Sequence, residues 1–295
     1  MRVFLTGATG FIGTAIADEL IGAGHSVLGV ARNDAAADLL TKRGILPHLG
    51  DLRDHDSFIS GAQACDAVIH CAFIHDFSKF TENIEIEHKT VAAMLEALAG
   101  SEMPFIATSG IAMLAPGRTA TEEDRPLDWG RGATENLVLG AASRGLRTSV
   151  IRLPPITHEN GEGGFLPALA QIARAKGVSA YVGDGENRWP AGHRRDAAHL
   201  YRLALKKGEP GASYMAVADE GLAMRDIAAA IGAKLGLPTA SVSNEEAQDH
   251  FGWLGMFIGT DMPASSQITR EHLGWRPSHT GLLQDIATAQ ALGAR

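Results

Sequence analysis

The sequence predicts an α/β protein with a doubly wound parallel sheet and a smaller, discontinuous C-terminal lobe. In the first half of the chain, short apolar runs alternate with amphipathic segments, which is typical of parallel strands joined by crossover helices. The first apolar run leads directly into a turn that contains Gly7, Gly10 and Gly13. A glycine turn between a strand and a helix is the context that dinucleotide binding requires, so the fold is expected to be of the Rossmann type.

The glycine turn has a clear physical function. Glycines allow the tight reversal and let backbone N–H groups approach a pyrophosphate, whose negative charge the helix N-terminus attracts. The helix is expected from Phe11 to about Ala23. The residues expected to contact a dinucleotide here are Gly7, Thr9, Gly10, Phe11, Ile12 and Gly13.

The second strand, at 26–30, indicates which dinucleotide binds. Arg32 and Asn33 follow this strand, where an acidic residue suits a ribose 2′-hydroxyl and an arginine suits a 2′-phosphate. NADP(H) is therefore the predicted cofactor. Further strands are expected at 45–49, 66–70, 105–108, 148–153 and 212–218, and helices at 34–43, 54–62, 80–98 and about 196–207.

Several later motifs match one superfamily. They are Gly50-Asp51-Leu52, His70-Cys71-Ala72, Thr108-Ser109-Gly110, Glu135, Arg152-Leu153-Pro154-Pro155, the segment from His193 to Asp196, and Leu273-Gly274-Trp275-Arg276-Pro277. With the glycine turn, they make the chain resemble the extended and atypical short-chain dehydrogenases/reductases, which include NAD(P)-dependent epimerases and dehydratases. The resemblance implies further cofactor contacts at Asp51, Leu52, Cys71, Ala72, Phe73, Thr108, Pro154, Pro155 and Ile156. Asp51 could equally cap the helix that starts near Asp54.

The superfamily's usual acid is absent. The resemblance implies a catalytic Ser109, but counting back from Glu135 puts Arg131 at the lysine position and Leu127 at the tyrosine position of its Tyr-x-x-x-Lys pair. The same register puts Glu87 at a helix position that is often asparagine. None of the chain's three tyrosines is followed four residues later by lysine. The standard tyrosine mechanism therefore does not carry over.

Two histidines are the candidate proton donors, because imidazole titrates near neutral pH. His75 follows the fourth strand, at the sheet edge where ligands bind, and is preferred over His193 in the segment that crosses the cleft. Arg131 is a candidate for hydrogen bonding to the nicotinamide ribose, although an arginine cannot relay a proton. The candidate substrate contacts are Phe77, Tyr181, Trp189, Phe251, Met256 and Phe257. The last three lie in a glycine-spaced segment, expected as a mobile loop, that could instead contact another subunit in a homodimer.

Composition excludes several other classes. The 295 residues carry a formal charge of −8, which argues against nucleic-acid binding. Two cysteines indicate no disulfide framework, no metal-ligand spacing is apparent, and no apolar run is long enough to span a membrane, so a cytoplasmic protein is expected. Residues 1–153, rejoined at about 194–218, should form the NADP-binding domain, and 154–295 the substrate lobe.

These observations predict an NADP(H)-dependent oxidoreductase that transfers hydride to or from a small carbonyl or related unsaturated compound. Two alternatives stay open. A chain without the tyrosine and lysine could bind the cofactor without turnover, as a redox sensor. It could also retain the cofactor while it epimerises or dehydrates its substrate.

Overall fold

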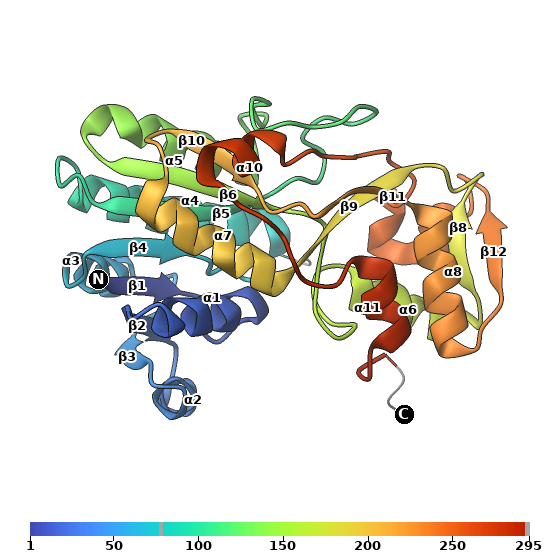
Figure 1. Cartoon of the computed structure of the whole chain (residues 1–295), viewed down its shortest axis with the longest axis horizontal. Helices are drawn as coiled ribbons and strands as arrows, with labels where there is room; N and C mark the ends of the chain where they lie inside the picture. The colour runs from blue at the N-terminus through green and yellow to red at the C-terminus, as the bar shows by residue number, and fades with distance from the viewer. Residues whose placement is uncertain (77–78, 293–295) are drawn as a thin grey trace.

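A seven-stranded sheet forms the larger lobe of the computed structural model, which describes residues 1–76 and 79–292. Its strands run in the order β10-β6-β5-β4-β1-β2-β3, and all neighbours are parallel (Figure 1). The predicted Rossmann-type fold is confirmed. The strands are β1 (Arg2–Thr6), β2 (Ser26–Ala31), β3 (Leu46–Leu49), β4 (Ala67–His70), β5 (Pro104–Gly110), β6 (Arg147–Leu153) and β10 (Ala212–Met215).

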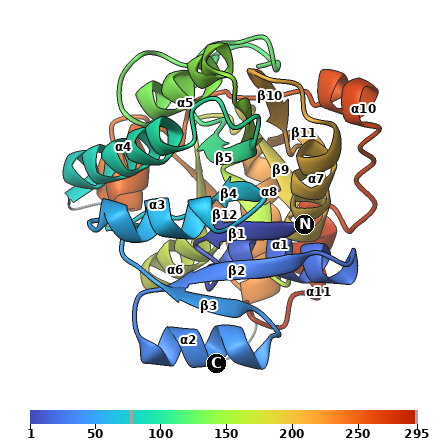
Figure 2. The ribbon, with the colours of Figure 1, turned by 90° about the vertical axis from the view of Figure 1, so that its left-hand side faces the viewer.

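Helices cover both faces of this sheet, because each carries one apolar stripe that must be buried. Figure 2 shows α1 and α7 on one face and α3, α4 and α5 on the other. Each face has its own buried apolar core. The helices of this lobe are α1 (Phe11–Gly22), α2 (Asp34–Lys42), α3 (His55–Gln63), α4 (Phe80–Ala97), α5 (Arg131–Gly140), the 3-10 helix η2 (Ala141–Arg144) and α7 (Arg194–Lys207).

The chain turns in opposite directions on leaving β1 and β4, which are neighbours in the sheet. Thr6 lies opposite His70 at the carboxyl ends of the two strands. The Thr6 hydroxyl accepts hydrogen bonds from the backbone N–H groups of Cys71 and Ala72, both at 3.1 Å, and lies 2.9 Å from Nδ1 of His70. Because the Thr6 oxygen already accepts two N–H groups, its own proton is directed to Nδ1 of His70, and burial keeps that ring neutral by lowering its pKa to about 3. Ligands of doubly wound sheets bind at such a switch point.

The smaller lobe contains a three-stranded and a two-stranded sheet. Its own core joins these sheets to the lobe's helices. The strands are β7 (Ile156–His158), β8 (Ser179–Val182), β9 (Arg188–His193), β11 (Asp219–Ala223) and β12 (Thr239–Val242). The helices are α6 (Leu166–Lys176), α8 (Met224–Leu235), α9 (Ala247–Phe251), the 3-10 helix η3 (Gly252–Met256) and α11 (Leu282–Thr288).

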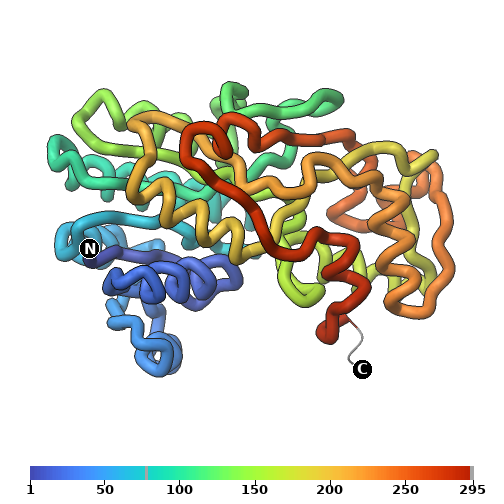
Figure 3. Tube along the Cα trace, in the orientation of Figure 1, coloured from blue at the N-terminus to red at the C-terminus, as the bar shows by residue number. Residues whose placement is uncertain are grey.

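The chain returns to the larger lobe twice. The first return is α7 and β10, within the predicted 194–218 segment. The second, which the sequence analysis did not predict, is α10 (Gln267–Leu273), and Figure 3 shows the trace crossing back there before it ends at α11. Leu273 and Trp275 are buried in the core shared with α1 and α7. The larger lobe therefore includes residues that the predicted boundaries assign to the substrate lobe.

Two predicted details need correction. The strand expected to reach Ala218 ends at Met215, because the chain then leaves the large sheet and the N–H of Ala218 bonds to the carbonyl of Ala191. The glycine-spaced segment after Phe251, expected as a loop, is the 3-10 helix η3. Phe77 lies outside the described residues.

Candidate active site

The glycine turn has the geometry that a dinucleotide needs. Gly7 adopts a φ of 69°, and a Cβ added to it would lie 2.9 Å from the carbonyl carbon and oxygen of Cys71. A Cβ on Gly13 would lie only 2.0 Å from the oxygen of Gly7. Helix α1 begins at Phe11 with no side-chain cap and no acidic residue in its first turn. Its first N–H groups and positive dipole end are therefore open to a pyrophosphate.

The residues after β2 differ in their surroundings. The side chain of Asn33 caps α2 by accepting a hydrogen bond from the N–H of Ala36 at 2.9 Å. Arg32 is exposed, and no acceptor in the described part of the chain bonds to its guanidinium. Of these two residues, Arg32 has the charge available for a ligand at the end of β2.

The two interpretations of Asp51 can now be compared. Helix α3 is capped by Asp54, whose carboxylate accepts a hydrogen bond from the N–H of Ser57 at 3.3 Å. Asp51 accepts from the N–H of Arg53 at 2.9 Å, and its side chain remains 43% exposed. Asp51 is therefore not the helix cap, and the interpretation as an adenine contact stays a prediction.

Arg131 makes several polar contacts at the carboxyl ends of the strands. Its Nε and Nη2 donate to the two carboxylate oxygens of Glu87 at 3.2 and 2.9 Å. Nη2 also donates to the backbone oxygen of Thr108 at 2.9 Å, and the guanidinium carbon lies 4.5 Å from the centre of the Phe73 ring. Burial raises the pKa of Glu87, although Arg131 opposes that shift.

Ser109 and His75 are each one residue or one ring removed from this arginine. Ser109 directly follows the residue that Arg131 bonds and is 8% exposed. The ring of His75 packs edge-on against Phe73, with centroids 5.2 Å apart. Partial desolvation lowers the pKa of His75 from its usual 6.5, and the charge of Arg131 lowers it further. Arg131 is therefore linked to His75 through the Phe73 ring and to the end of β5 through the carbonyl of Thr108, the residue before Ser109.

Two of the three tyrosines, Tyr201 and Tyr214, are not placed to act as acids. The Tyr201 hydroxyl is buried and lies 2.7 Å from that of Thr108, and burial raises its pKa well above its usual value. Tyr214 is buried, and its hydroxyl accepts from the N–H of Glu209 at 2.9 Å. Burial likewise raises the pKa of the Cys71 thiol to about 11, so this thiol is inert at neutral pH.

His193 belongs to a different cluster. Its Nδ1 caps α7 by accepting a hydrogen bond from the N–H of Arg195 at 3.2 Å. Its ring stacks on His279 with centroids 4.7 Å apart and meets His158 edge-on at 5.5 Å. Burial, followed by the charges of these two neighbours, lowers its pKa to about 4. His193 is neutral at physiological pH, and its described contacts do not include Ser109 or Arg131.

The residues after β6 continue into the smaller lobe. Pro154, Pro155 and Ile156 are buried. The carbonyl of Pro154 accepts from the Thr157 hydroxyl at 3.2 Å, and that of Pro155 from the N–H of Phe165 at 3.0 Å. Both proline carbonyls therefore already accept a hydrogen bond within the protein. A contact between this segment and the nicotinamide stays a prediction.

Some of the predicted substrate contacts form an aromatic cluster. Trp189 is fully buried and stacks on Phe257 with centroids 6.3 Å apart, and Phe165 lies 5.5 Å from Phe257. Trp253 is 42% exposed and Met256 is 79% exposed. The cluster therefore has a buried base and an exposed edge.

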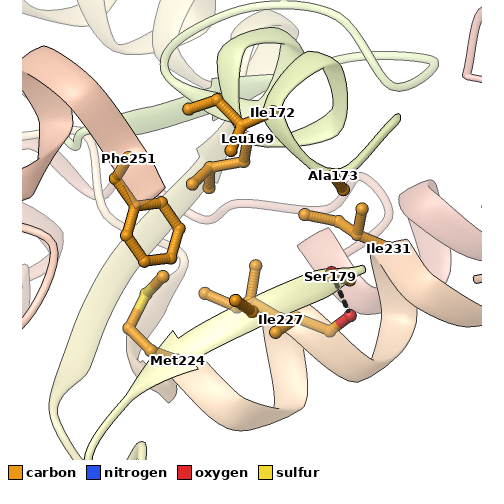
Figure 4. A pocket seen from close by; sticks show the side chains of 10 residues that line it. Leu169, Ile172, Ala173, Ser179, Met224, Ile227, Ile231 and Phe251 are labelled. Atoms are coloured by element: carbon orange, nitrogen blue, oxygen red, sulfur yellow. Dashed lines mark hydrogen bonds between the residues drawn. The ribbon is translucent and has the colours of Figure 1, made fainter. Parts of the chain in front are cut away.

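Phe251 and Tyr181 lie elsewhere in the smaller lobe. Phe251 is 3% exposed and lines a cavity of about 10 Å³ between α6, β8 and α8, where it faces Met224 and Leu169 (Figure 4). That volume holds at most one water molecule, so the cavity is a packing defect. Tyr181 is half-buried in β8. The packing of Phe251 is accounted for by the core.

Sequence reasoning missed a contact with the glycine turn. Nη1 of Arg194 donates to the carbonyl of Phe11 at 3.1 Å, and its guanidinium carbon lies 4.4 Å from the Phe11 ring centre. Glu159 bonds both Arg194 and Arg195. The only available indication was the pair of adjacent arginines at the start of a predicted helix.

The described residues include neither a candidate metal site nor a membrane-spanning helix. No group of three or more histidine, cysteine, aspartate or glutamate side chains there is placed to bind a metal ion. No helix within residues 1–76 and 79–292 has the length and apolar character needed to cross a membrane.

The turn, the sheet and the polar group at its carboxyl edge define a nicotinamide-dinucleotide protein. The chain belongs to the NAD dependent epimerase/dehydratase family, whose model matches residues 3–217. It is 45% identical to an uncharacterised protein of Schizosaccharomyces pombe, C2A9.02, over 98% of this chain and 99% of that protein.

Two more distant proteins are also similar. The chain is 27% identical to the decarboxylating sterol-4-alpha-carboxylate 3-dehydrogenase of Dictyostelium discoideum, over 70% of this chain and 68% of that enzyme. The structure of MoeE5 in complex with UDP-glucose and NAD matches with a TM-score of 0.76 and 21% identity, over 99% of this chain and 98% of that one. The structural match shows the fold alone.

Proposed function

We propose that this protein is an NADP(H)-dependent oxidoreductase that transfers hydride to or from a small carbonyl compound without a catalytic tyrosine. The observation that carries the proposal is the group formed by Ser109, Arg131 and His75 at the carboxyl edge of the sheet. The family assignment supports a nicotinamide cofactor. A dehydrogenase among the similar proteins supports redox chemistry.

Each residue of the group has a separate chemical role. The nicotinamide, when bound, supplies or accepts the hydride. The Ser109 hydroxyl donates a hydrogen bond to the substrate oxygen and polarises the carbonyl. Arg131 donates to the nicotinamide ribose and remains charged throughout, because guanidinium does not deprotonate in proteins.

His75 is the proposed proton donor. A reduced carbonyl becomes an alkoxide that must take up a proton, and neither Ser109 nor Arg131 is an acid at neutral pH. Burial, followed by the charge of Arg131, lowers the pKa of His75, so the protonated form that can donate becomes more populated as the pH falls. The described contacts of His193 argue against it as the donor to the same substrate.

Arg32 is the proposed determinant of cofactor choice. Its exposed guanidinium follows β2, where a 2′-phosphate would lie. Arg32→Ala should weaken NADPH binding about 10- to 100-fold, as expected for loss of a charge-assisted hydrogen bond, and leave NADH binding almost unchanged. Arg144→Ala is the matched control, since Arg144 is also exposed and pairs with Glu96 on another side of the lobe.

Fluorescence titration with both nucleotides tests this directly. If Arg32→Ala lost affinity for NADPH and NADH equally, Arg32 would not contact the 2′-phosphate that distinguishes the two nucleotides. The purified protein should then oxidise NADPH in the presence of a carbonyl substrate. Binding without any substrate-dependent oxidation would favour the redox sensor, and turnover without net cofactor consumption would favour the epimerase or dehydratase.

A further inference from the structure

Glu87 is a buried acidic residue on the inward face of α4, only 1% exposed. A carboxylate in such a position is costly unless it is paired and hydrogen-bonded. Its partner is Arg131, through the two parallel N–H to oxygen contacts at 3.2 and 2.9 Å. This planar, two-point contact fixes the orientation of a guanidinium as well as its position.

The remaining contacts of Arg131 leave one edge open. Nε and Nη2 are used by Glu87 and the Thr108 carbonyl, and Phe73 covers one face. The other two of the five guanidinium donors are on Nη1, which has no acceptor among the residues that the structure describes. The Arg131 side chain is 29% exposed. Part of the side chain therefore faces solvent, and Nη1 is the nitrogen left to bond a ligand.

The charge of the pair affects what that edge can bind. A lone guanidinium would attract carboxylates and phosphates strongly. Paired with an ionised carboxylate, it has no net charge and attracts distant anions only weakly. Its N–H groups can still donate hydrogen bonds to neutral oxygens.

We propose that Glu87 is a positioning residue that presents the Nη1 edge of Arg131 to neutral hydroxyl groups and prevents anions from occupying it. The inference rests on the proposed function, in which Arg131 lies beside the nicotinamide ribose. A purely structural ion pair would contribute to stability alone. The two roles differ in how the protein responds to small anions.

Glu87→Gln removes the charge and keeps the shape of the side chain. NADPH affinity should be measured by fluorescence titration while sodium formate replaces sodium chloride at constant ionic strength. Formate should leave the affinity of the wild-type protein unchanged and weaken that of Glu87→Gln about 3- to 10-fold, because the unpaired guanidinium captures the carboxylate. A lower melting temperature without any formate effect would leave only a structural role and overturn the proposal.

Glu85→Gln is the matched control on the same helix. Glu85 is exposed, its carboxylate lies 3.8 Å from the Lys89 ammonium, and its side chain is 64% exposed. It should behave as the wild type in the formate titration. If Glu85→Gln were as sensitive to formate as Glu87→Gln, the loss of any acidic charge would be sufficient to cause the effect. The specific role proposed for Glu87 would then be wrong.

Chemical rescue provides a second test that does not depend on the folding of Glu87→Gln. Arg131→Ala should bind NADPH more weakly, and added guanidinium ion should restore the affinity saturably, because Glu87 still offers its carboxylate. Without rescue, the proposed holding role fails.

The two proposals can fail separately. If Arg131→Ala binds NADPH as well as the wild type, the proposed function of Arg131 is wrong and the inference falls with it. If Arg131→Ala is impaired while Glu87→Gln matches Glu85→Gln, only the role of Glu87 is wrong. Once a substrate is known, Glu87→Gln should lower kcat by about 100-fold and leave the substrate KM nearly unchanged, since misplacing a reacting group costs turnover more than binding.

Discussion

Three glycines of α1 and its turn should respond differently to the same substitution with alanine. A Cβ on Gly13 would lie 2.0 Å from the oxygen of Gly7, and backbone atoms cannot rotate away as a side chain can. The contact is about 1.4 Å too short, so Gly13→Ala should cost about 3 kcal/mol or more, the upper part of the usual range for overpacking. At about 2 °C per kcal/mol for a chain of this size, the melting temperature should fall by about 6 °C or more.

Gly10 and Gly22 separate function from folding. A Cβ on Gly10 would lie 3.2 Å from the same oxygen, and its φ of −80° suits alanine. Gly10→Ala should therefore fold normally but obstruct the uncapped end of α1, and weaken nucleotide binding about 10- to 100-fold. A Cβ on Gly22 meets nothing within 4 Å, so Gly22→Ala should stabilise the protein by about 0.4–1 kcal/mol.

Thermal denaturation and calorimetric titration with NADPH measure the two effects separately. Gly13→Ala should lose both stability and binding, Gly10→Ala mainly binding, and Gly22→Ala neither. The interpretation would be refuted if Gly10→Ala bound NADPH normally, or if Gly13→Ala melted at the wild-type temperature. The first result would mean that the pyrophosphate does not bind at this turn. The second would mean that the turn relaxes without a cost in stability.

Three further predictions concern the buried and titrating groups. His75→Ala should lower turnover about 10²- to 10⁴-fold, the usual contribution of general acid catalysis. In the wild type, the rate of carbonyl reduction should rise as the pH falls and level off below the lowered pKa of His75, because the proton donor must be protonated. A rate that does not change with pH in this range would contradict the role of His75. Glu135→Gln leaves the fully buried Arg152 without its ionised partner and should destabilise the fold by about 3–5 kcal/mol, measured by denaturant unfolding. Cys71 should resist alkylation by iodoacetamide in the native protein at pH 8, as followed by mass spectrometry, because its pKa is about 11.

The sequence alone predicted the fold class and the glycine turn correctly, because both depend on local patterns. Alternating apolar runs require parallel strands with crossover helices, and glycine stands at positions 7 and 13, where no Cβ fits. The superfamily register also named Glu87 and Arg131. It could not show that they meet, since they are 44 residues apart and pair only when α4 and α5 pack on the same face of the sheet.

Only the tertiary structure decided which polar side chains share a site. Sequence position placed both His75 and His193 at the cleft and preferred His75 only because it follows a strand end, whereas the structure packs His75 beside Phe73, which Arg131 covers, and makes His193 the cap of α7 within a histidine cluster. It also could not predict that α10 returns to the larger lobe and buries Trp275 there. Periodicity determines which face of an element is buried, but side-chain partners depend on how two elements, far apart in the chain, are rotated and shifted against each other.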